Sequence, residues 1–435
     1  MFKRKFEVNL KKWKENYIKK PLLVIGARQV GKTFIIKKFI NDNFDNYIYI
    51  NFDEEKKYAE FFQEDLNPER IIRDIANYRN QTINIKKTIF FFDEVQKSEE
   101  VIASLKYFEE SDQEYKIICA GSLLGVLLNR FTKSFPVGKV YFEYMFPMDF
   151  EEFLWALDEE NLSERIVENY KSMKPLPNPL HEKALELYYK YLYIGGMPEA
   201  IKEFLAKEKD IQSFDRGIQQ NIISAYLADM AKYADSHQII KTVEVYNSIS
   251  HQLAKKNKKF IYKNINERAK SKTHGNAISW LIDAGLVLKC NRLDKLEKPF
   301  KFYELQNDFK LYLSDVGLLC KLSDFSYSAI AYKEGTEFRG VLAENYIAQQ
   351  LTSNKVPLYY RTETRDIEVD FMIIINEKII PIEVKASSNT KSLSLNKMQD
   401  KYNFEYSIRI SSKNFGFVNK IKSVPLYAVY LIKQI

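Results

Sequence analysis

Residues 26–33 have the sequence G-A-R-Q-V-G-K-T, which fits the phosphate-binding pattern G-x-x-x-x-G-K-[ST]. The glycines let backbone N–H groups wrap a phosphate, and a helix that starts there adds partial positive charge. We expect Lys32 to reach the β- and γ-phosphates of a nucleotide, and the Thr33 hydroxyl to ligate Mg²⁺. The predicted nucleotide-binding residues of this loop are Gly26, Ala27, Arg28, Gln29, Val30, Gly31, Lys32 and Thr33.

Downstream of that loop, an apolar run at residues 88–92 is followed directly by two acidic residues. An acid at the end of such a strand holds Mg²⁺, and the acid after it can polarise the attacking water. We therefore expect Asp93 to hold the metal and Glu94 to act as the catalytic base. Ser122 follows the apolar run 116–120, and its hydroxyl is expected to point at the γ-phosphate. No [NT]-K-x-D guanine signature is present, so the sequence favours ATP over GTP.

Arg130 closes the helix predicted after Ser122. In an oligomeric ATPase of this topology, Arg130 could reach into a neighbouring copy as an arginine finger. A solvated arginine at a helix end explains the position at least as well. A homo-oligomer is therefore compatible with the sequence and is not required by it.

The elements that must position these residues are short apolar strands that alternate with helices over the first 150 residues. This alternation predicts an α/β fold with a parallel sheet, whose carboxyl edge holds the ligand.

The net charge of +8 permits a nucleic-acid partner without requiring one. Three widely spaced cysteines argue against a disulfide framework and favour a reducing compartment. Without a signal-peptide pattern or an apolar run near ~18 residues, we expect a cytoplasmic protein with no membrane partner.

A second group of chemically capable residues lies near the other end of the chain. Residues 367–375 and 379–384 are predicted strands, and a two-residue turn between them would place Asp370 directly opposite Glu383. Lys385 shares their face, and Glu344 on the preceding helix is the usual fourth member of such a set. The spacing D-x₁₂-E-x-K is that of PD-(D/E)xK nucleases, in which the acids hold Mg²⁺ and the lysine orients water or stabilises charge. Lys385 could instead simply neutralise the two acids.

A basic stretch lies between these two groups, within residues 255–272. The region around it is predicted to contain helices at 239–253, 264–269 and 274–285 and strands at 286–288 and 300–303, which is a winged-helix pattern. The eight basic residues face one acid, Glu267, and could contact nucleic-acid phosphates. A solvated face or a protein connector explains them equally well. The eight are Lys255, Lys256, Lys258, Lys259, Lys263, Arg268, Lys270 and Lys272.

Nearly the whole chain resembles prokaryotic AAA-type ATPases that carry a C-terminal domain of unknown function related to restriction endonucleases. The resemblance rests on the loop at 26–33 and on F-F-D-E-V-Q at 91–96, A-G-S at 120–122, F-P-M-D-F-E-E-F at 146–153, G-G-M-P-E-A at 195–200, L-S-D-V-G-L-L at 313–319, G-V-L-A-E-N at 340–345, E-V-D-F at 368–371 and I-E-V-K at 382–385. The family usually has arginine where this chain has Lys139. A lysine offers a point charge in place of a planar fork, which weakens the case for nucleotide sensing there.

The resemblance implies a multidomain α/β protein. Its parts would be a P-loop core at residues 1–150, a helical lid at 151–234, a winged helix at 235–304 and a nuclease-like α/β domain at 305–435. The main hypothesis is an ATPase, with ATP and Mg²⁺ as cofactors, coupled to a domain that binds or cleaves DNA rather than RNA. The alternative is a nucleotide-switched module whose nuclease-like domain is catalytically silent and binds DNA or a protein partner.

Overall fold

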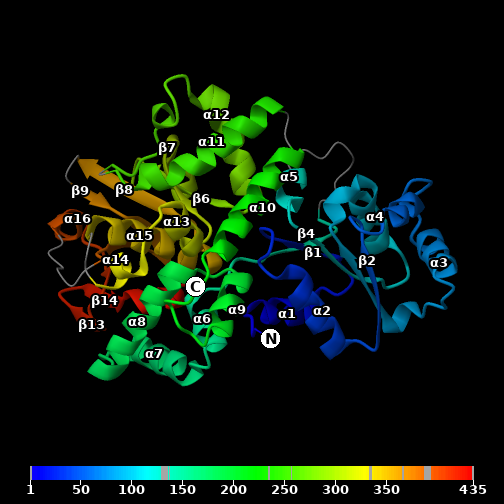
Figure 1. Ribbon diagram of the computed structural model, residues 1–435, viewed down its shortest axis with the longest axis horizontal. Coiled ribbons are helices and arrows are strands. Elements are labelled where there is room, and N and C mark those ends of the chain that lie inside the picture. Colours follow the sequence, from blue (N-terminus) through cyan, green and yellow to red (C-terminus); the bar gives the residue numbers. More distant parts are fainter. Residues whose placement is uncertain are drawn as a thin grey trace. The chain divides into compact units, whose positions relative to one another are not determined.

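Five short runs in the first third of the chain form a parallel sheet (Figure 1). In the computed structural model the sheet order is β2-β3-β4-β1-β5, and each hydrogen-bonded pair of neighbours is parallel. Strands β1 and β3 are buried along their whole length, which explains their uninterrupted apolar sequences. The bounds are β1 Leu22–Ile25, β2 Asn46–Asn51, β3 Thr88–Asp93, β4 Lys116–Gly121 and β5 Tyr141–Tyr144. The predicted α/β class and the parallel sheet are confirmed.

The structure describes residues 2–128, 136, 138–233, 236–255, 257–332, 336–364, 367–386 and 393–433. The chain divides into two compact units. The N-terminal unit comprises Arg4–Phe146 and Asp283–Gly285, and the C-terminal unit comprises Met1–Lys3, Pro147–Ile282 and Leu286–Ile435. Among the described residues, no helix is both long and apolar enough to span a membrane. The finer division into lid, winged helix and nuclease-like domain stays a prediction.

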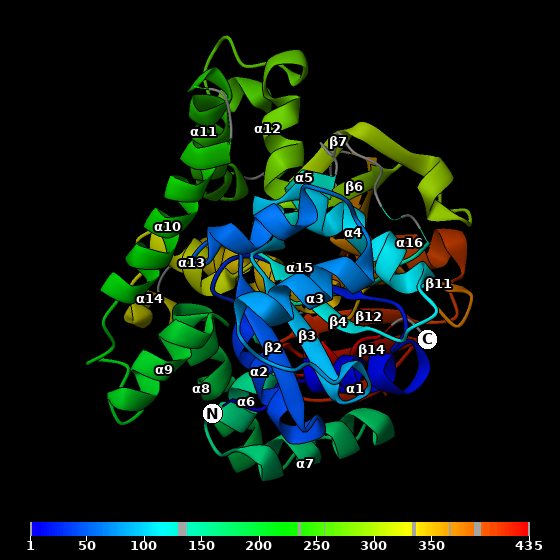
Figure 2. The same ribbon diagram turned by 90° about the vertical axis from the view of Figure 1, so that its right-hand side faces the viewer.

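Helices and 3-10 turns cover the sheet of the N-terminal unit, and Figure 2 shows β2, β3 and β4 side by side there. Helix α3 illustrates how the sequence sets an element, because Asn67 caps its first turn and three isoleucines form its buried face. The core of the sheet is rich in aromatic side chains, among them Phe52, Phe62 and Phe92. The elements are α1 Phe6–Asn16, α2 Lys32–Asn43, η1 Lys56–Phe62, α3 Pro68–Tyr78, η2 Ile85–Lys87, η3 Val95–Lys97, α4 Glu99–Glu110 and α5 Leu124–Leu128.

The C-terminal unit begins with a run of helices and continues with two sheets that are interleaved with further helices. The helices are α6 Phe150–Ala156, α7 Glu160–Ser172, α8 Asn178–Ile194, α9 Pro198–Ala206, α10 Gly217–Tyr233, α11 Ser236–Leu253, η4 Tyr262–Asn264, α12 Ser271–Asp283, α13 Val316–Leu322, α14 Tyr327–Ala331, α15 Thr336–Ser353, α16 Leu393–Tyr402 and η6 Leu426–Leu431. Helix α8 is capped at its C-terminus by Gly195, whose φ of 86° suits a residue without a Cβ atom.

The two sheets of the C-terminal unit meet at Asp370. One sheet has the order β7-β6-β8-β9 and the other β10-β11-β12-β14-β13. Asp370 is the single residue between β9 and β10, so the chain changes sheet at this acid. The strands are β6 Val287–Leu293, β7 Glu304–Leu313, β8 Tyr359–Thr364, β9 Ile367–Val369, β10 Phe371–Ile375, β11 Lys378–Val384, β12 Ser407–Ser411, β13 Gly416–Val418 and β14 Ile421–Pro425.

Two elements predicted around the basic stretch are wrong. The helix predicted at 264–269 is absent, because the Asn266 side chain accepts a hydrogen bond from the Arg268 N–H and so stabilises a turn instead. The strand predicted at 300–303 is a 3-10 helix, η5 Phe300–Tyr303, closed by the Phe302 N–H donating to the Pro299 carbonyl. The hairpin partner of β6 is β7, which starts at Glu304. The helices predicted at 239–253 and 274–285 are confirmed as α11 and α12.

Four of the sequence motifs meet in the core of the C-terminal unit. The Met148 N–H donates to the Gly196 carbonyl at 2.7 Å, and the Gly196 N–H donates to Asp315 Oδ2 at 2.6 Å. Asn345 exchanges two hydrogen bonds with the backbone of Leu313, at 2.8 and 3.0 Å. Buried polar groups of this kind fix one arrangement of the surrounding helices. These motifs therefore have a structural role in the unit.

Candidate functional site

The loop after β1 is shaped for close backbone approach. Gln29 and Gly31 adopt positive φ values of 66° and 97°. A Cβ atom on Gly26 would lie 2.2 Å from the Met145 carbonyl oxygen, so only glycine fits there. Arg4 supports the loop from α1's side, because its guanidinium donates to the carbonyls of Val30 at 2.8 Å and Phe146 at 2.7 Å. No sequence pattern marks Arg4 for this task.

Lys32 begins α2 and is buried, with 6% of its surface exposed. Its ammonium donates to the carbonyls of Gly26 at 2.8 Å and Ala27 at 2.9 Å. The positive charge is thus held over the loop whose N–H groups would face an anion. This placement is compatible with the predicted role of Lys32 in phosphate binding.

Thr33 and Asp93 come together because β1, which leads into the loop before α2, and β3 both pair with β4. The Thr33 hydroxyl donates to Asp93 Oδ2 at 2.8 Å, and the Tyr49 hydroxyl donates to the same oxygen at 3.2 Å. Burial, followed by the charge of Asp93, raises the pKa of Tyr49 well above its ordinary value. Tyr49 therefore stays a proton donor to Asp93. A hydroxyl and a carboxylate side by side form a donor set that suits Mg²⁺.

Glu94 and Ser122 are joined through Gln96. The Gln96 amide nitrogen donates to Glu94 Oε2 and lies 3.4 Å from Ser122 Oγ. Strand β4 lies between β1 and β3, so Ser122 at its end is next to both the loop and the acids. Glu94 itself has a φ of 54°, a strained conformation for a residue with a side chain. Gln96, which ends the F-F-D-E-V-Q motif but was given no role from sequence, thus links the predicted base to the predicted γ-phosphate contact.

Lys139, a further predicted residue, stands apart from this arrangement. Lys139 pairs with Glu109 at 3.0 Å and Glu110 at 3.2 Å, and the hydrogen bond to Glu109 is the main cause that raises the pKa of Lys139. Its ammonium is thus engaged at the end of α4. Arg130 lies outside the described residues.

The predicted hairpin near the C-terminus has the expected register. Ile375 pairs with Lys378 and Phe371 with Ile382, which places Asp370 opposite Glu383 one step further along. Both turn residues, Asn376 and Glu377, have positive φ values of 47° and 62°, as this type of two-residue turn demands. The hairpin prediction is confirmed.

The acids of this region form a cluster that we call the C-terminal acidic cluster: Glu344, Glu368, Asp370 and Glu383. Asp370 Oδ2 accepts a hydrogen bond from the Val384 N–H at 2.8 Å, and Lys385 lies 3.0 Å from Glu383 Oε1. Burial, followed by the charge of Glu344, raises the pKa of Asp370 to about 7. Within the described part of the chain, Glu383 Oε2 is buried and has no hydrogen-bond partner.

Two lysines enter the same cluster. Lys310, in the middle of β7, lies 3.0 Å from Glu344 Oε1 and 2.7 Å from Glu368 Oε1. Lys258, from the basic stretch, pairs with Glu344 Oε2, and the Tyr312 hydroxyl donates to Glu344 Oε1. Despite burial, Lys258 and Lys310 lower the pKa of Glu344 to about 2. Over the described ranges, no group of three or more His, Cys, Asp or Glu side chains is placed to hold a metal ion.

Comparison with known families gives a descriptive match for the N-terminal part of the chain only. Residues 18–154 match a family model described as an AAA domain. They contain the loop, Asp93, Glu94 and Ser122 in the geometry above. The N-terminal unit thus contains an AAA-type P-loop domain that is similar to those of ATPases. Residues 185–329 and 339–429 match two models that are each described only as a domain of unknown function, DUF8612 and DUF4143. No curated protein matches the chain.

Solved structures resemble the chain more loosely. A Walker-type ATPase of Pyrococcus abyssi is 16% identical, with a TM-score of 0.47 over 75% of this chain and 96% of that one. The ORC2 protein of Aeropyrum pernix is 11% identical, with a TM-score of 0.40 over 76% and 95%. DnaA from Aquifex aeolicus is 14% identical, with a TM-score of 0.29 over 65% and 89%. At these scores the likeness is partial, and no property of those proteins transfers to this chain.

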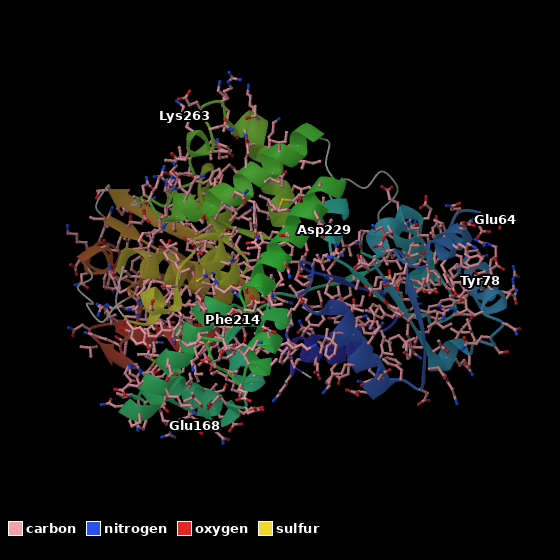
Figure 3. All side chains as sticks on the ribbon, in the orientation of Figure 1. Glu64, Tyr78, Glu168, Phe214, Asp229 and Lys263 are labelled. Atoms are coloured by element: carbon pink, nitrogen blue, oxygen red, sulfur yellow. The ribbon has the colours of Figure 1, made fainter. Side chains whose placement is uncertain are left out.

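In the C-terminal unit, some residues of the basic stretch pair with acids and others are exposed. Lys258 forms an ion pair with Glu344, and Lys259 forms one with Asp308 at 2.9 Å. Lys255 is partly exposed, and Lys256 lies outside the described residues. The other four members are exposed, and Figure 3 shows Lys263 at the outer margin of this region. These four, together with partly exposed Lys241 on α11, form what we call the cationic surface: Lys241, Lys263, Arg268, Lys270 and Lys272.

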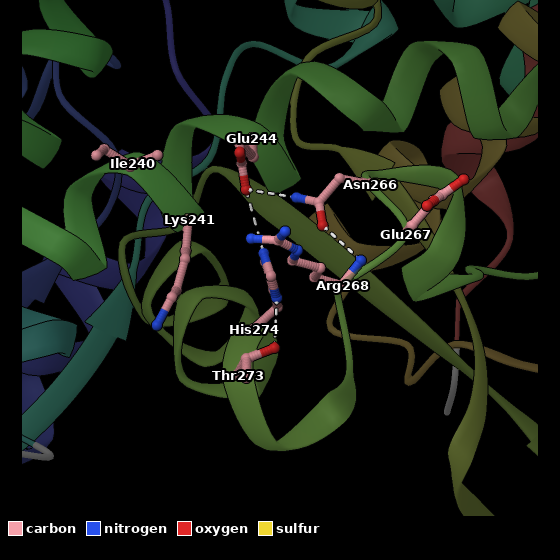
Figure 4. A pocket seen from close by; sticks show the side chains of 8 residues that line it. All are labelled: Ile240, Lys241, Glu244, Asn266, Glu267, Arg268, Thr273 and His274. Atoms are coloured by element: carbon pink, nitrogen blue, oxygen red, sulfur yellow. Dashed lines mark hydrogen bonds and ion pairs between the residues drawn. The ribbon is translucent and has the colours of Figure 1, made fainter.

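A pocket of about 550 Å³ opens within the cationic surface, between α11 and the start of α12 (Figure 4). Lys241 and Arg268 line it, as does the buried His274, whose Nε2 lies 3.2 Å from Glu244 Oε2. The Asn266 amide also donates to Glu244, at 3.2 Å. The sequence indicated the charge here but not the pocket, because Lys241 and Arg268 are brought together only by the fold.

Proposed function

We propose that the chain hydrolyses ATP in its AAA-type domain, and that this cycle switches a C-terminal unit that binds nucleic acid. The hydrogen bond between the Thr33 hydroxyl and Asp93 Oδ2, at 2.8 Å, is the observation that carries the ATPase proposal. It joins the predicted phosphate-binding helix to the predicted metal-holding strand. A hydroxyl and a carboxylate at this distance suit one magnesium ion that is also bound to phosphate oxygens.

The proposal assigns one role to each residue of the nucleotide site. Lys32 contacts the β- and γ-phosphates, Thr33 and Asp93 hold Mg²⁺, and Ser122 contacts the γ-phosphate. When bound, Mg²⁺ neutralises charge on the phosphate oxygens. Glu94 accepts a proton from water as the water oxygen bonds to the γ-phosphorus and the bond to the ADP oxygen breaks. The products are ADP and inorganic phosphate. Gln96 orients Glu94 and is placed to transmit a change at Ser122.

Steady-state ATP hydrolysis and nucleotide binding test this proposal together. We expect Lys32→Ala to lose binding, and Glu94→Gln to bind ATP and lose at least about a hundredfold in kcat, as is usual for a positioned base. Lys57→Ala, at an exposed site of the same domain, is the control. An unaltered kcat in Glu94→Gln would refute the assignment of the base, and unaltered ATP binding in Lys32→Ala would refute the site.

The nucleic-acid part of the proposal is supported by the cationic surface around the pocket. Its charges come from α11, η4, the turn before α12 and the first turn of α12, so an anionic backbone could contact several at once. The helices α11 and α12 with the β6–β7 hairpin are compatible with the predicted winged helix. The negative charge of Glu244 at the pocket favours contacts to the backbone over burial of a phosphate inside the pocket.

Binding of a DNA duplex, measured against salt concentration, tests this part. We expect the triple variant Arg268→Glu, Lys270→Glu and Lys272→Glu to bind more weakly and with a shallower salt dependence, by about 0.9 in log–log slope for each phosphate that is no longer neutralised. The control triple, Lys56→Glu, Lys57→Glu and Lys87→Glu, changes net charge equally in the ATPase domain. Binding without salt dependence, or no binding, would favour a protein partner.

The sequence also suggested DNA cleavage by Asp370, Glu383 and Lys385. The hairpin register supports this candidate, because it brings the two acids opposite one another. The lysines that pair with Glu344 oppose it, since a nuclease of this class needs its acids open to Mg²⁺. We therefore favour a catalytically silent C-terminal unit. Metal-dependent cleavage of plasmid DNA that is lost in Asp370→Asn would reverse this preference.

A further inference from the structure

We infer that Lys310 and Lys258 are the built-in cations of the C-terminal acidic cluster, and that this cluster therefore does not take a divalent metal. The inference does not depend on ATP hydrolysis or on nucleic-acid binding. It concerns the group that the nuclease-like sequence pattern implies, Mg²⁺ at Glu344, Asp370 and Glu383. The side chains present do not fit that ion.

Glu344 is the first reason. A carboxylate ligates a metal through an oxygen with an open lone pair. Here Oε1 accepts from Lys310 Nζ at 3.0 Å and from the Tyr312 hydroxyl, while Oε2 pairs with Lys258. Glu344 is itself buried, with 1% of its surface exposed. Its charge is thus already compensated by three donors from other elements.

Lys310 is the second reason. It is 1% exposed, so its ammonium needs partners within the fold. It has them in Glu344 and in Glu368 at 2.7 Å, and its charge lies 4.8 Å from the centre of the Tyr360 ring. The surrounding acids keep this buried lysine charged, because Glu344, Glu368 and Asp370 raise its pKa well above the ordinary value. A divalent ion entering the cluster would meet this fixed positive charge.

The charge balance points the same way. Lys258 and Lys310 together bring two positive charges, the same number that Mg²⁺ would bring. Lys258 is the more peripheral of the two, with 24% of its side chain exposed, and it comes from the irregular segment between α11 and η4. Lys310 lies within β7 and is 1% exposed, so its charge is the more firmly enclosed of the two. Of the two, Lys310 is the cation that excludes the metal.

What remains of the cluster is a partial metal site. Asp370 Oδ2 accepts the Val384 N–H, which leaves Oδ1 as a possible ligand. Glu383 Oε2 is buried and has no partner among the described residues. Removal of the Lys310 charge would add Glu344 Oε1 and Glu368 Oε1 to these ligands. The structure thus predicts that a single substitution turns an internal ion-pair cluster into a divalent-cation site.

The test uses the full chain in an Asp93→Asn background, which weakens the metal site of the ATPase domain. Mn²⁺ binding is measured by electron paramagnetic resonance, and thermal unfolding is followed with and without Mn²⁺. We expect the background protein to show no Mn²⁺ binding that depends on Asp370. Addition of Lys310→Met should lower Tm without metal and create one Mn²⁺ site with a metal-dependent rise in Tm. A further Asp370→Asn should abolish that site.

Several results would overturn the inference. If the background protein already binds one Mn²⁺ that Asp370→Asn or Glu383→Gln removes, the cluster is a metal site as it stands. If a folded Lys310→Met protein binds no Mn²⁺, Lys310 is not the excluding cation. If Lys310→Met does not fold, the background measurement still decides whether the native cluster takes a metal. Lys258→Met then serves as the second variant, with weaker but detectable Mn²⁺ binding expected.

Discussion

The Thr33 hydroxyl lies 2.8 Å from Asp93 Oδ2, although 60 residues separate the two in sequence. The contact exists because β1 and β3 are both parallel neighbours of β4, so their carboxyl ends meet at one edge. Each residue alone is a common type in a common motif. Their juxtaposition turns two sequence patterns into one site, and the nearest side chains then acquire testable roles.

Tyr49→Phe removes the hydroxyl that donates to Asp93 Oδ2 and leaves the ring in place. Asp93 then loses one of the groups that orient it, while the ring keeps its contact with the Lys37 ammonium, 3.6 Å from the ring centre. We expect kcat for ATP to fall about fivefold and the Mg²⁺ concentration for half-activity to rise, because such a hydrogen bond is worth roughly 1 kcal/mol. ATP hydrolysis at graded Mg²⁺ measures both. Tyr47→Phe, exposed on the same strand, should change neither; equal effects of the two substitutions would argue against this role for Tyr49.

Gln96→Ala breaks the link between Glu94 and Ser122. We expect ATP affinity to stay unchanged and kcat to fall at least about tenfold, since a hydrogen bond to a charged group is worth roughly 1.5–3 kcal/mol. Gln96→Glu should lower kcat further, because a second negative charge would repel Glu94. Gln113→Ala, at an exposed glutamine of the same unit, is the control. A loss of ATP binding in Gln96→Ala with kcat preserved would contradict a role in orienting the base.

Asp315 predicts a pH dependence for the C-terminal unit. Burial raises the pKa of this acid from 3.8 to about 6, against the backbone hydrogen bonds that lower it. The folded state therefore binds the proton more tightly than the unfolded state, so this group's contribution to stability is present below pH 3.8 and is lost as pH rises through about 6. The loss is up to about 3 kcal/mol.

The measurement compares urea unfolding of wild type and Asp315→Asn between pH 4 and pH 7. Other titrating groups, including Glu344, are common to both proteins and cancel in the difference. We expect the stability advantage of the wild type over Asp315→Asn to shrink as pH rises. A difference that stays constant across this range would show that Asp315 titrates at the same pH in both states.

The ATPase site could be predicted from sequence because its determinants are local. The loop, its two flanking elements and the acids after β3 each have a pattern of their own, and a parallel sheet brings strand ends together. The sequence could not predict the roles of Arg4, Tyr49 and Gln96, because these roles depend on contacts between separate elements. Tyr49 lies on β2, and nothing in its own strand indicates that its hydroxyl reaches Asp93.

The C-terminal unit shows the same division between local and distant determinants. The register of the hairpin follows from its two-residue turn, and the sequence predicted it. The contacts of the two lysines with the acidic cluster could not be predicted from the sequence. Lys310 and Glu344 are 34 residues apart, and Lys258 and Glu344 are 86 apart. The helix predicted at 264–269 was wrong because the Asn266 side chain competes locally with helix formation.

The hairpin turn that aligns Asp370 with Glu383 gives the last prediction. Glu377 has a φ of 62°, in the left-handed region that favours glycine, and its side chain pairs with Lys298 at 2.7 Å while 88% exposed. An ion pair so exposed contributes little, so the strain of the backbone outweighs it. We expect Glu377→Gly to be more stable than Glu377→Ala by about 1 kcal/mol, because both lose the ion pair and only glycine relieves the strain. Chemical unfolding of the two variants measures the difference directly. Equal stability would mean that the turn relaxes to a negative φ in the alanine variant, and the Asp370–Glu383 alignment would then not depend on this turn.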